Sequence, residues 1–160
     1  MIRIVILAVG RMREPWMAEG VAEYLKRLTP MARVEIREAP EEKVPDNPGP
    51  AQIRQVLARE AEGLGRMIEE RTCRIVLDRG GTPLSSPQFA ALIGEVSGQG
   101  RSHFTFLIGG SHGLDAGLIS SADRSLSFGP MTYPHMLMRV ILLEQLYRSF
   151  KIIRGEPYHK

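Results

Sequence analysis

Short apolar runs alternate along the chain with longer segments in which apolar residues recur every three or four positions. The short runs are typical of buried strands, and the longer segments are typical of helices that cover a sheet. Strands are expected at 3–9, 32–37, 74–78, 103–108 and 124–127. This alternation predicts an α/β fold, with a mostly parallel sheet covered by helices on both faces.

Four of the longer segments carry helical spacing. The first helix is expected to open at Pro15, a residue that suits a first helical turn. The second is expected at 50–68, with Ile53, Leu57, Ala61, Leu64 and Ile68 on its buried face. The third is expected to have Ser86 as its N-cap, and the last is expected at 134–153. The proline-rich segment 39–49 is expected to be an exposed loop.

The last helix is apolar around most of its circumference. Its apolar residues are Met136, Leu137, Met138, Val140, Ile141, Leu142, Leu143, Leu146, Tyr147 and Phe150. A single stripe facing the sheet does not account for all of them, which predicts a homodimer formed through this C-terminal helix. The alternative is a central helix buried within one chain, because helices that are apolar all round also occur in protein cores.

Length and composition indicate one globular domain over residues 1–160. The chain is 43% hydrophobic and 24% charged, which excludes disordered and collagen-like classes. Its one cysteine, Cys73, is expected to be a small buried apolar residue. No apolar run reaches the length of about 18 residues that a membrane span needs, and the run 4–9 is too short for a secretory signal. A cytoplasmic protein that does not engage a membrane is therefore expected.

The positive charge is concentrated at the C-terminal end. The segment 139–160 holds five basic residues against two acidic ones, and this excess equals the net charge of +3 of the whole chain. An uneven distribution of this kind favours an anionic partner that approaches one end of the molecule.

Three glycine-containing segments follow expected strands, at 77–81, 107–115 and 128–133. In open α/β sheets ligands bind beyond the carboxyl ends of the strands, so these segments are expected to form one pocket. None carries the spacing of a dinucleotide-binding or phosphate-binding loop. No metal site is expected, because the four histidines have no metal-binding spacing and a single cysteine cannot build a zinc site.

Several segments together resemble the ribosomal large subunit methyltransferase H family, which belongs to the SPOUT class. They are the turn 108–110, the segment 131–135, the helix 139–148 and the ending 155–159. The resemblance implies a deep trefoil knot at the C-terminal end, a homodimer, and S-adenosylmethionine as the methyl donor. It also implies methylation of N3 of a pseudouridine in 23S rRNA of the assembled ribosome.

The resemblance also implies which residues bind the cofactor. They are Leu77, Gly109, Phe128, Gly129, Pro130, Met131, Thr132 and Tyr133. These positions coincide with the three segments expected to form the pocket. Relatives often have a Ser-Lys pair where this chain has Gly129-Pro130, and proline has no amide proton to donate, which removes one main-chain contact.

Methylation at N3 requires that the proton on that nitrogen leaves. The candidate bases are His135 and His159, because histidine titrates near neutral pH. The alternatives are that His135 caps a helix and that His159 contacts phosphate. The residues expected to bind RNA are Arg139, Arg148, Arg154, Tyr158, His159 and Lys160.

Two other functions fit the same pattern. One is a ribosome-binding or RNA-binding module without catalytic activity, in which the glycine turns serve structure alone. The other is a flavodoxin-like nucleotide-binding protein, which the strand-loop-helix order favours and the lack of a phosphate-binding sequence weakens.

Overall fold

A computed structural model describes all residues, 1–160. Its centre is one parallel sheet of five strands in the order β2-β1-β4-β3-β5. The strands are β1 (Ile2–Val9), β2 (Ala32–Ala39), β3 (Cys73–Pro83), β4 (His103–Ile108) and β5 (Arg124–Ser127). The predicted α/β class and parallel sheet are confirmed.

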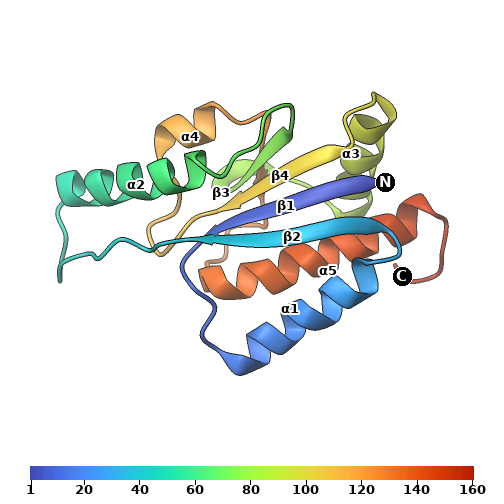
Figure 1. The fold of residues 1–160 in the computed structure, drawn as a ribbon, viewed down its shortest axis with the longest axis horizontal. Helices are drawn as coiled ribbons and strands as arrows, with labels where there is room; N and C mark the ends of the chain where they lie inside the picture. The colour runs from blue at the N-terminus through green and yellow to red at the C-terminus, as the bar shows by residue number, and fades with distance from the viewer.

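Five helices cover both faces of the sheet (Figure 1). They are α1 (Pro15–Leu28), α2 (Pro50–Gly65), α3 (Ser86–Gly98), α4 (Ala116–Ser120) and α5 (His135–Ile153). The connections that run toward the β2 edge carry α1 and α3 on one face, and α5 packs there too. Those that run toward the β5 edge carry α2 and α4 on the other face. A single handedness of crossover requires this division.

The central strand β1 shows why its sequence is continuously apolar. Its residues alternate between two cores, because successive side chains of a strand point to opposite faces. Ile4, Ile6 and Ala8 belong to the larger core beneath α1, α3 and α5. Val5 and Leu7 belong to the smaller core beneath α2 and α4. Both faces of β1 are therefore buried.

The third strand departs from the prediction. β3 was expected to end at Asp78 and to turn through two glycines, but it continues to Pro83 after a register shift between Leu77 and Thr82. At Gly81 a Cβ atom would lie 2.8 Å from the carbonyl carbon of Ser125. Because only glycine allows β5 to approach this closely, the second glycine permits strand pairing to resume.

Two helix boundaries also differ by a few residues. The N-cap of α3 is Ser85, whose hydroxyl accepts from the amide of Gln88, and not Ser86 as expected. α2 ends at Gly65, and its buried face carries Val56, Glu60 and Leu64.

Contacts within one chain bury most of the apolar surface of α5. It packs against α1 and α3 as well as against the sheet. Leu137 and Ile141, on its outer side, are half-buried and lie outside the core cluster. The structure thus favours the alternative that this helix is largely buried in the monomer. The apolar character of the helix is therefore not an argument for a homodimer by itself. No helix combines the length and apolarity that a membrane crossing requires.

Candidate active site

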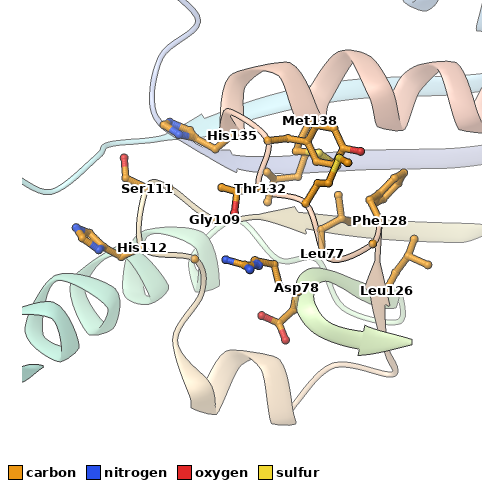
Figure 2. A pocket seen from close by; sticks show the side chains of 17 residues that line it. Leu77, Asp78, Gly109, Ser111, His112, Leu126, Phe128, Thr132, His135 and Met138 are labelled. Atoms are coloured by element: carbon orange, nitrogen blue, oxygen red, sulfur yellow. The ribbon is translucent and has the colours of Figure 1, made fainter. Parts of the chain in front are cut away.

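A pocket of about 340 Å³ lies where the register shift of β3 and the carboxyl ends of β4 and β5 meet the start of α5 (Figure 2). This volume is in the range of small-molecule sites. Its apolar lining comes from the strands through Leu77 and Leu126, from Phe128 after β5, and from Met138 of α5. The opposite wall is the glycine turn that follows β4. The three predicted segments therefore line one site.

The glycine turn is closed by its own main chain. Gly113 has a φ of 83° and donates to the carbonyl of Gly110 at 3.1 Å. A Cβ atom on Gly109 would lie 2.2 Å from the carbonyl oxygen of Gly113. No side chain fits at that distance, so Gly109 is required for the turn to close on itself.

The segment after β5 forms the outer wall. Gly129 has a φ of 104°, and its amide donates to the hydroxyl of Ser127. The amides of Met131, Thr132 and Tyr133 donate to no acceptor in the protein. Unpaired main-chain amides are suited to hydrogen-bond the polar edge of an aromatic heterocycle, and the apolar wall is suited to contact its flat faces.

Seven of the eight residues expected to bind the cofactor line this pocket, namely Leu77, Gly109, Phe128, Gly129, Met131, Thr132 and Tyr133. Pro130 does not, and its carbonyl oxygen lies 3.4 Å from a guanidinium nitrogen of Arg79. Sequence reasoning missed Leu126 and Met138 as lining residues. Leu126 lies two residues before the predicted Phe128, and Met138 lies one helical turn after the predicted His135, so this spacing is the signal that could have found them.

His135 lies at the first residue of α5 and lines the pocket. Its Nε2 atom is buried and has no hydrogen-bond partner. Burial lowers the pKa of this imidazole, the nearby carboxylate of Glu41 opposes that shift, and Arg139 adds to it. His135 therefore favours the neutral form, which a proton acceptor needs.

His159 lies elsewhere on the molecule. Its Nδ1 atom is 3.3 Å from a guanidinium nitrogen of Arg148. Arg148 follows His135 by 13 residues on the same helix, which corresponds to about 20 Å along the axis. The two candidate bases of one chain therefore do not meet, and His159 does not line the pocket.

The expectation that Arg139 contacts RNA is wrong for this structure. Its side chain is 1% exposed, and one guanidinium nitrogen donates to the carbonyls of Val9 and Gly10. The other donates to the carboxylate of Glu38 at 2.8 Å. Arg139 instead joins α5 to the ends of β1 and β2, beneath the surface that RNA could reach.

The C-terminal tail folds back onto α5. The hydroxyl of Tyr158 donates to Glu144, and its ring packs edge-on against Tyr147 at 4.9 Å between centroids. Burial, followed by a hydrogen bond with Tyr24, raises the pKa of Tyr158 to about 12. Its ring is therefore engaged within the protein and is not free to stack on a base in this conformation.

The basic residues near the tail differ in their availability. Arg148 pairs with Glu144 at 2.6 Å and lies over the ring of Tyr158. Arg154 is exposed and donates to the carbonyl of Pro30 at 3.2 Å. His159 and Lys160 are exposed. Arg154, His159 and Lys160 are thus the members of the predicted RNA-binding set that reach solvent most freely.

A buried carboxyl group lies behind the glycine turn, and the sequence did not indicate it. Glu60 of α2 is 5% exposed, and its carboxylate would lie 3.4 Å from a Cβ atom on Gly110. Its single hydrogen bond comes from the amide of Glu42, at 3.4 Å. Burial raises the pKa of Glu60, the Glu42 amide opposes the shift, and the charges of Glu41 and Glu42 add to it.

Comparison with known proteins agrees with this geometry. Residues 2–159 match the family described as "predicted SPOUT methyltransferase". The chain is 51% identical over 160 residues to ribosomal RNA large subunit methyltransferase H of Moorella thermoacetica, with all of both chains covered. It is 52% identical to the protein of the same name from Carboxydothermus hydrogenoformans, covering 98% of this chain and 99% of that protein.

A solved structure shares the fold. It is a probable methyltransferase from Bordetella pertussis, with a TM-score of 0.59 and 14% sequence identity, covering 92% of this chain and 96% of that one. The full-length sequence matches carry the family assignment. The chain belongs to the SPOUT methyltransferase family and, within it, to the ribosomal large subunit methyltransferase H family.

Proposed function

We propose that this protein transfers a methyl group from S-adenosylmethionine to N3 of a pseudouridine in 23S rRNA of the assembled large subunit or ribosome. The observation that carries the proposal is the single pocket walled by Leu77, the Gly109 turn and the segment 128–133. Relatives at about half identity over the full length are named ribosomal RNA large subunit methyltransferases. A ribosomal substrate would place the activity in the cytoplasm.

The residues present fit the methyl donor. An adenine ring needs apolar faces and hydrogen-bonding partners at its edge, which Leu77, Phe128 and the free amides of 131–133 offer. When bound, S-adenosylmethionine supplies a methyl group on a positively charged sulfur. No metal is needed for such a displacement, since its rate depends on holding donor and acceptor in line in a water-poor site.

The proton on N3 must leave during transfer. His135 lines the pocket and favours its neutral form, so it is the histidine placed to accept that proton. His159 is assigned to RNA contact together with Arg154 and Lys160, which are exposed, whereas Arg148 and Tyr158 are engaged with Glu144 and shape the tail.

The position of the tail supports a homodimeric enzyme. The tail lies along α5, about 20 Å from the chain's own pocket by the rise of the helix. If it holds RNA during methyl transfer, a second copy with its α5 packed against the first can bring it to the pocket. A two-fold contact would bury Leu137 and Ile141 and leave both pockets with a neighbouring tail.

The chain path after β5 supports the proposed trefoil knot. β5 is the edge strand, whereas α5 lies between α1 and α3 on one face of the sheet. The segment 128–134 joins them and passes the Gly109 turn in the pocket wall. The proposed knot consists of this passage followed by α5.

The test is rRNA mapping combined with reconstitution. We expect 23S rRNA from cells that lack the protein to lose one N3-methylated pseudouridine by mass spectrometry. Purified protein with S-adenosylmethionine should restore it on ribosomes from those cells. Unchanged rRNA would reject the proposal. Binding of ribosomes with no heat of binding for S-adenosylmethionine would indicate a non-catalytic RNA-binding module instead.

A further inference from the structure

A second hollow adjoins the pocket. It has a volume of about 420 Å³ and is lined by Gly110, Ser111, Thr132, Tyr133, Pro134 and His135. Five of these residues also line the first pocket, so the two hollows share a wall. Tyr133 is 38% exposed and offers an aromatic face. His135 is the side chain here whose ordinary pKa lies near neutral pH, and burial lowers that pKa.

The carboxylate of Glu41 lies beside His135. A Cβ atom on Gly10 would be 3.3 Å from Oε2 of Glu41 and 3.4 Å from Nε2 of His135, so the two atoms flank one point. The other carboxylate oxygen of Glu41 accepts from the hydroxyl of Ser111 at 3.3 Å. This hydrogen bond anchors Glu41 to the glycine turn.

The charge of Glu41 distinguishes the two neutral forms of His135. The nearby negative charge of Glu41 stabilises a proton on Nε2 through space, without a direct hydrogen bond, and disfavours an unpartnered lone pair there. A neutral histidine with its proton on one ring nitrogen presents an acceptor on the other. Glu41 therefore favours an imidazole whose Nδ1 atom is free to accept a proton.

We infer that Glu41 is a positioning residue that keeps the proton of His135 on Nε2, so that Nδ1 accepts the N3 proton of an imide-type base held in the second hollow. This inference rests on the proposed function. The N3–H bond breaks and its proton moves to Nδ1. The electron pair of N3 forms the bond to the methyl carbon, while the carbon–sulfur bond breaks and its pair stays on sulfur. The imidazolium then releases its proton to solvent.

The charges around His135 determine how the site responds to pH. Glu41 faces it from the loop after β2, and Arg139 faces it from α5, where Arg139 is itself paired with Glu38. Since the Glu41 carboxylate favours the imidazolium, its removal should lower the pKa of His135. The substitution Glu41→Gln keeps the shape of the side chain and removes the charge. Glu42→Gln is the matched control, because Glu42 is next in sequence and its carboxylate lies 4.0 Å from Arg59.

The first measurement is ¹⁵N NMR of histidine-labelled full-length protein over a pH series. The wild type should show the Nε2–H form of His135. Glu41→Gln should lower the pKa of His135 and mix the two neutral forms, and Glu42→Gln should change neither. A wild-type Nδ1–H form, or an identical titration in Glu41→Gln, would overturn the inference.

The second measurement is single-turnover methylation of ribosomes as a function of pH. Glu41→Gln should reduce the maximal rate about tenfold. It should also shift the acidic limb of the rate–pH profile to lower pH, by the same amount as the pKa of His135 measured by NMR. The calorimetric affinity for S-adenosylmethionine should not change. A wild-type profile in Glu41→Gln would reject the inference and leave the proposed function standing. Absence of methylation by the wild type would reject the function, and the NMR result would still decide whether Glu41 orients His135.

Discussion

The side chain of Arg139 is among the largest fully buried side chains of the molecule. Its neighbours on the buried stripe of α5 are Leu142, Leu143, Leu146 and Phe150, at helical spacing. That spacing is visible in the sequence and would have placed Arg139 inside. The charge of the residue argued for the surface, and the acceptors that satisfy it, two strand-end carbonyls and Glu38, come together only in the folded chain.

We expect Arg139→Met to destabilise the protein by about 3 kcal/mol, because it removes one member of a buried ion pair and leaves two carbonyls without a donor. Chemical denaturation at one fixed protein concentration measures this cost. Arg154→Met is the control, since Arg154 is exposed and should contribute less than about 1 kcal/mol. Equal unfolding midpoints for the two variants would show that the Arg139 contacts do not hold α5 to the sheet.

The buried carboxyl group of Glu60 should make folding stability depend on pH. Its folded-state pKa is raised above the ordinary value of 4.5, first by burial. The folded state then binds the proton more tightly than the unfolded state, so folding stability declines as the pH rises through the raised pKa. Glu60→Gln removes the buried charge and should increase the thermal midpoint at pH 7. The gain should vanish near pH 4, where the wild-type carboxyl is protonated.

Thermal unfolding across that pH range provides the comparison. Glu62→Gln is the matched control, because Glu62 lies on the same helix and its side chain is 73% exposed. We expect that variant to follow the wild type at every pH. A Glu60→Gln variant less stable than wild type at pH 7 would mean that the carboxylate makes a stabilising contact in the folded protein.

At the scale of elements, the sequence predicted β4 and β5 at their observed bounds and the start of α1 at Pro15. Buried parallel strands have a strong apolar signal, and proline marks a helix start. The second half of β3 was not predictable in the same way. Its residues Arg79, Gly80 and Gly81 resemble a turn and fall within the register shift, and pairing with β5 resumes at Thr82 because Gly81 allows a close main-chain approach.

The glycine turn after β4 is the element on which the proposed donor binding would depend. Gly109→Ala places a methyl group 2.2 Å from the carbonyl oxygen of Gly113, so the turn must open. We expect calorimetry to show at least a tenfold loss of affinity for S-adenosylmethionine, about 1.4 kcal/mol. Gly98→Ala is the control, because a Cβ atom there meets nothing within 4 Å. Unchanged affinity in Gly109→Ala would exclude the turn from the donor site.

At the scale of the whole molecule, the pocket and the tail of one chain lie at different places along α5. The sequence predicted both groups of residues but could not predict their separation, which depends on the direction of α5 across the sheet and on the tail folding back to Tyr147. Deletion of residues 154–160 should leave the donor pocket intact and abolish methyl transfer to ribosomes. Loss of donor affinity in the truncated chain would show that the tail supports the pocket of its own chain.

Mixed dimers test the proposed homodimer and whether its two groups act across subunits. A chain truncated after Ile153 has a pocket without a tail, and a Gly109→Ala chain has a tail without a working pocket. Each is expected to be nearly inactive alone when S-adenosylmethionine is limiting. When the two are co-expressed in equal amounts, half of the dimers are mixed and each of these has one complete site, so activity should recover to about a quarter of the wild-type value. Since neither chain can complete a site by itself, recovery requires that the tail of one subunit serves the pocket of the other. No recovery in mixtures shown by mass spectrometry to contain mixed dimers would confine the tail to some other role.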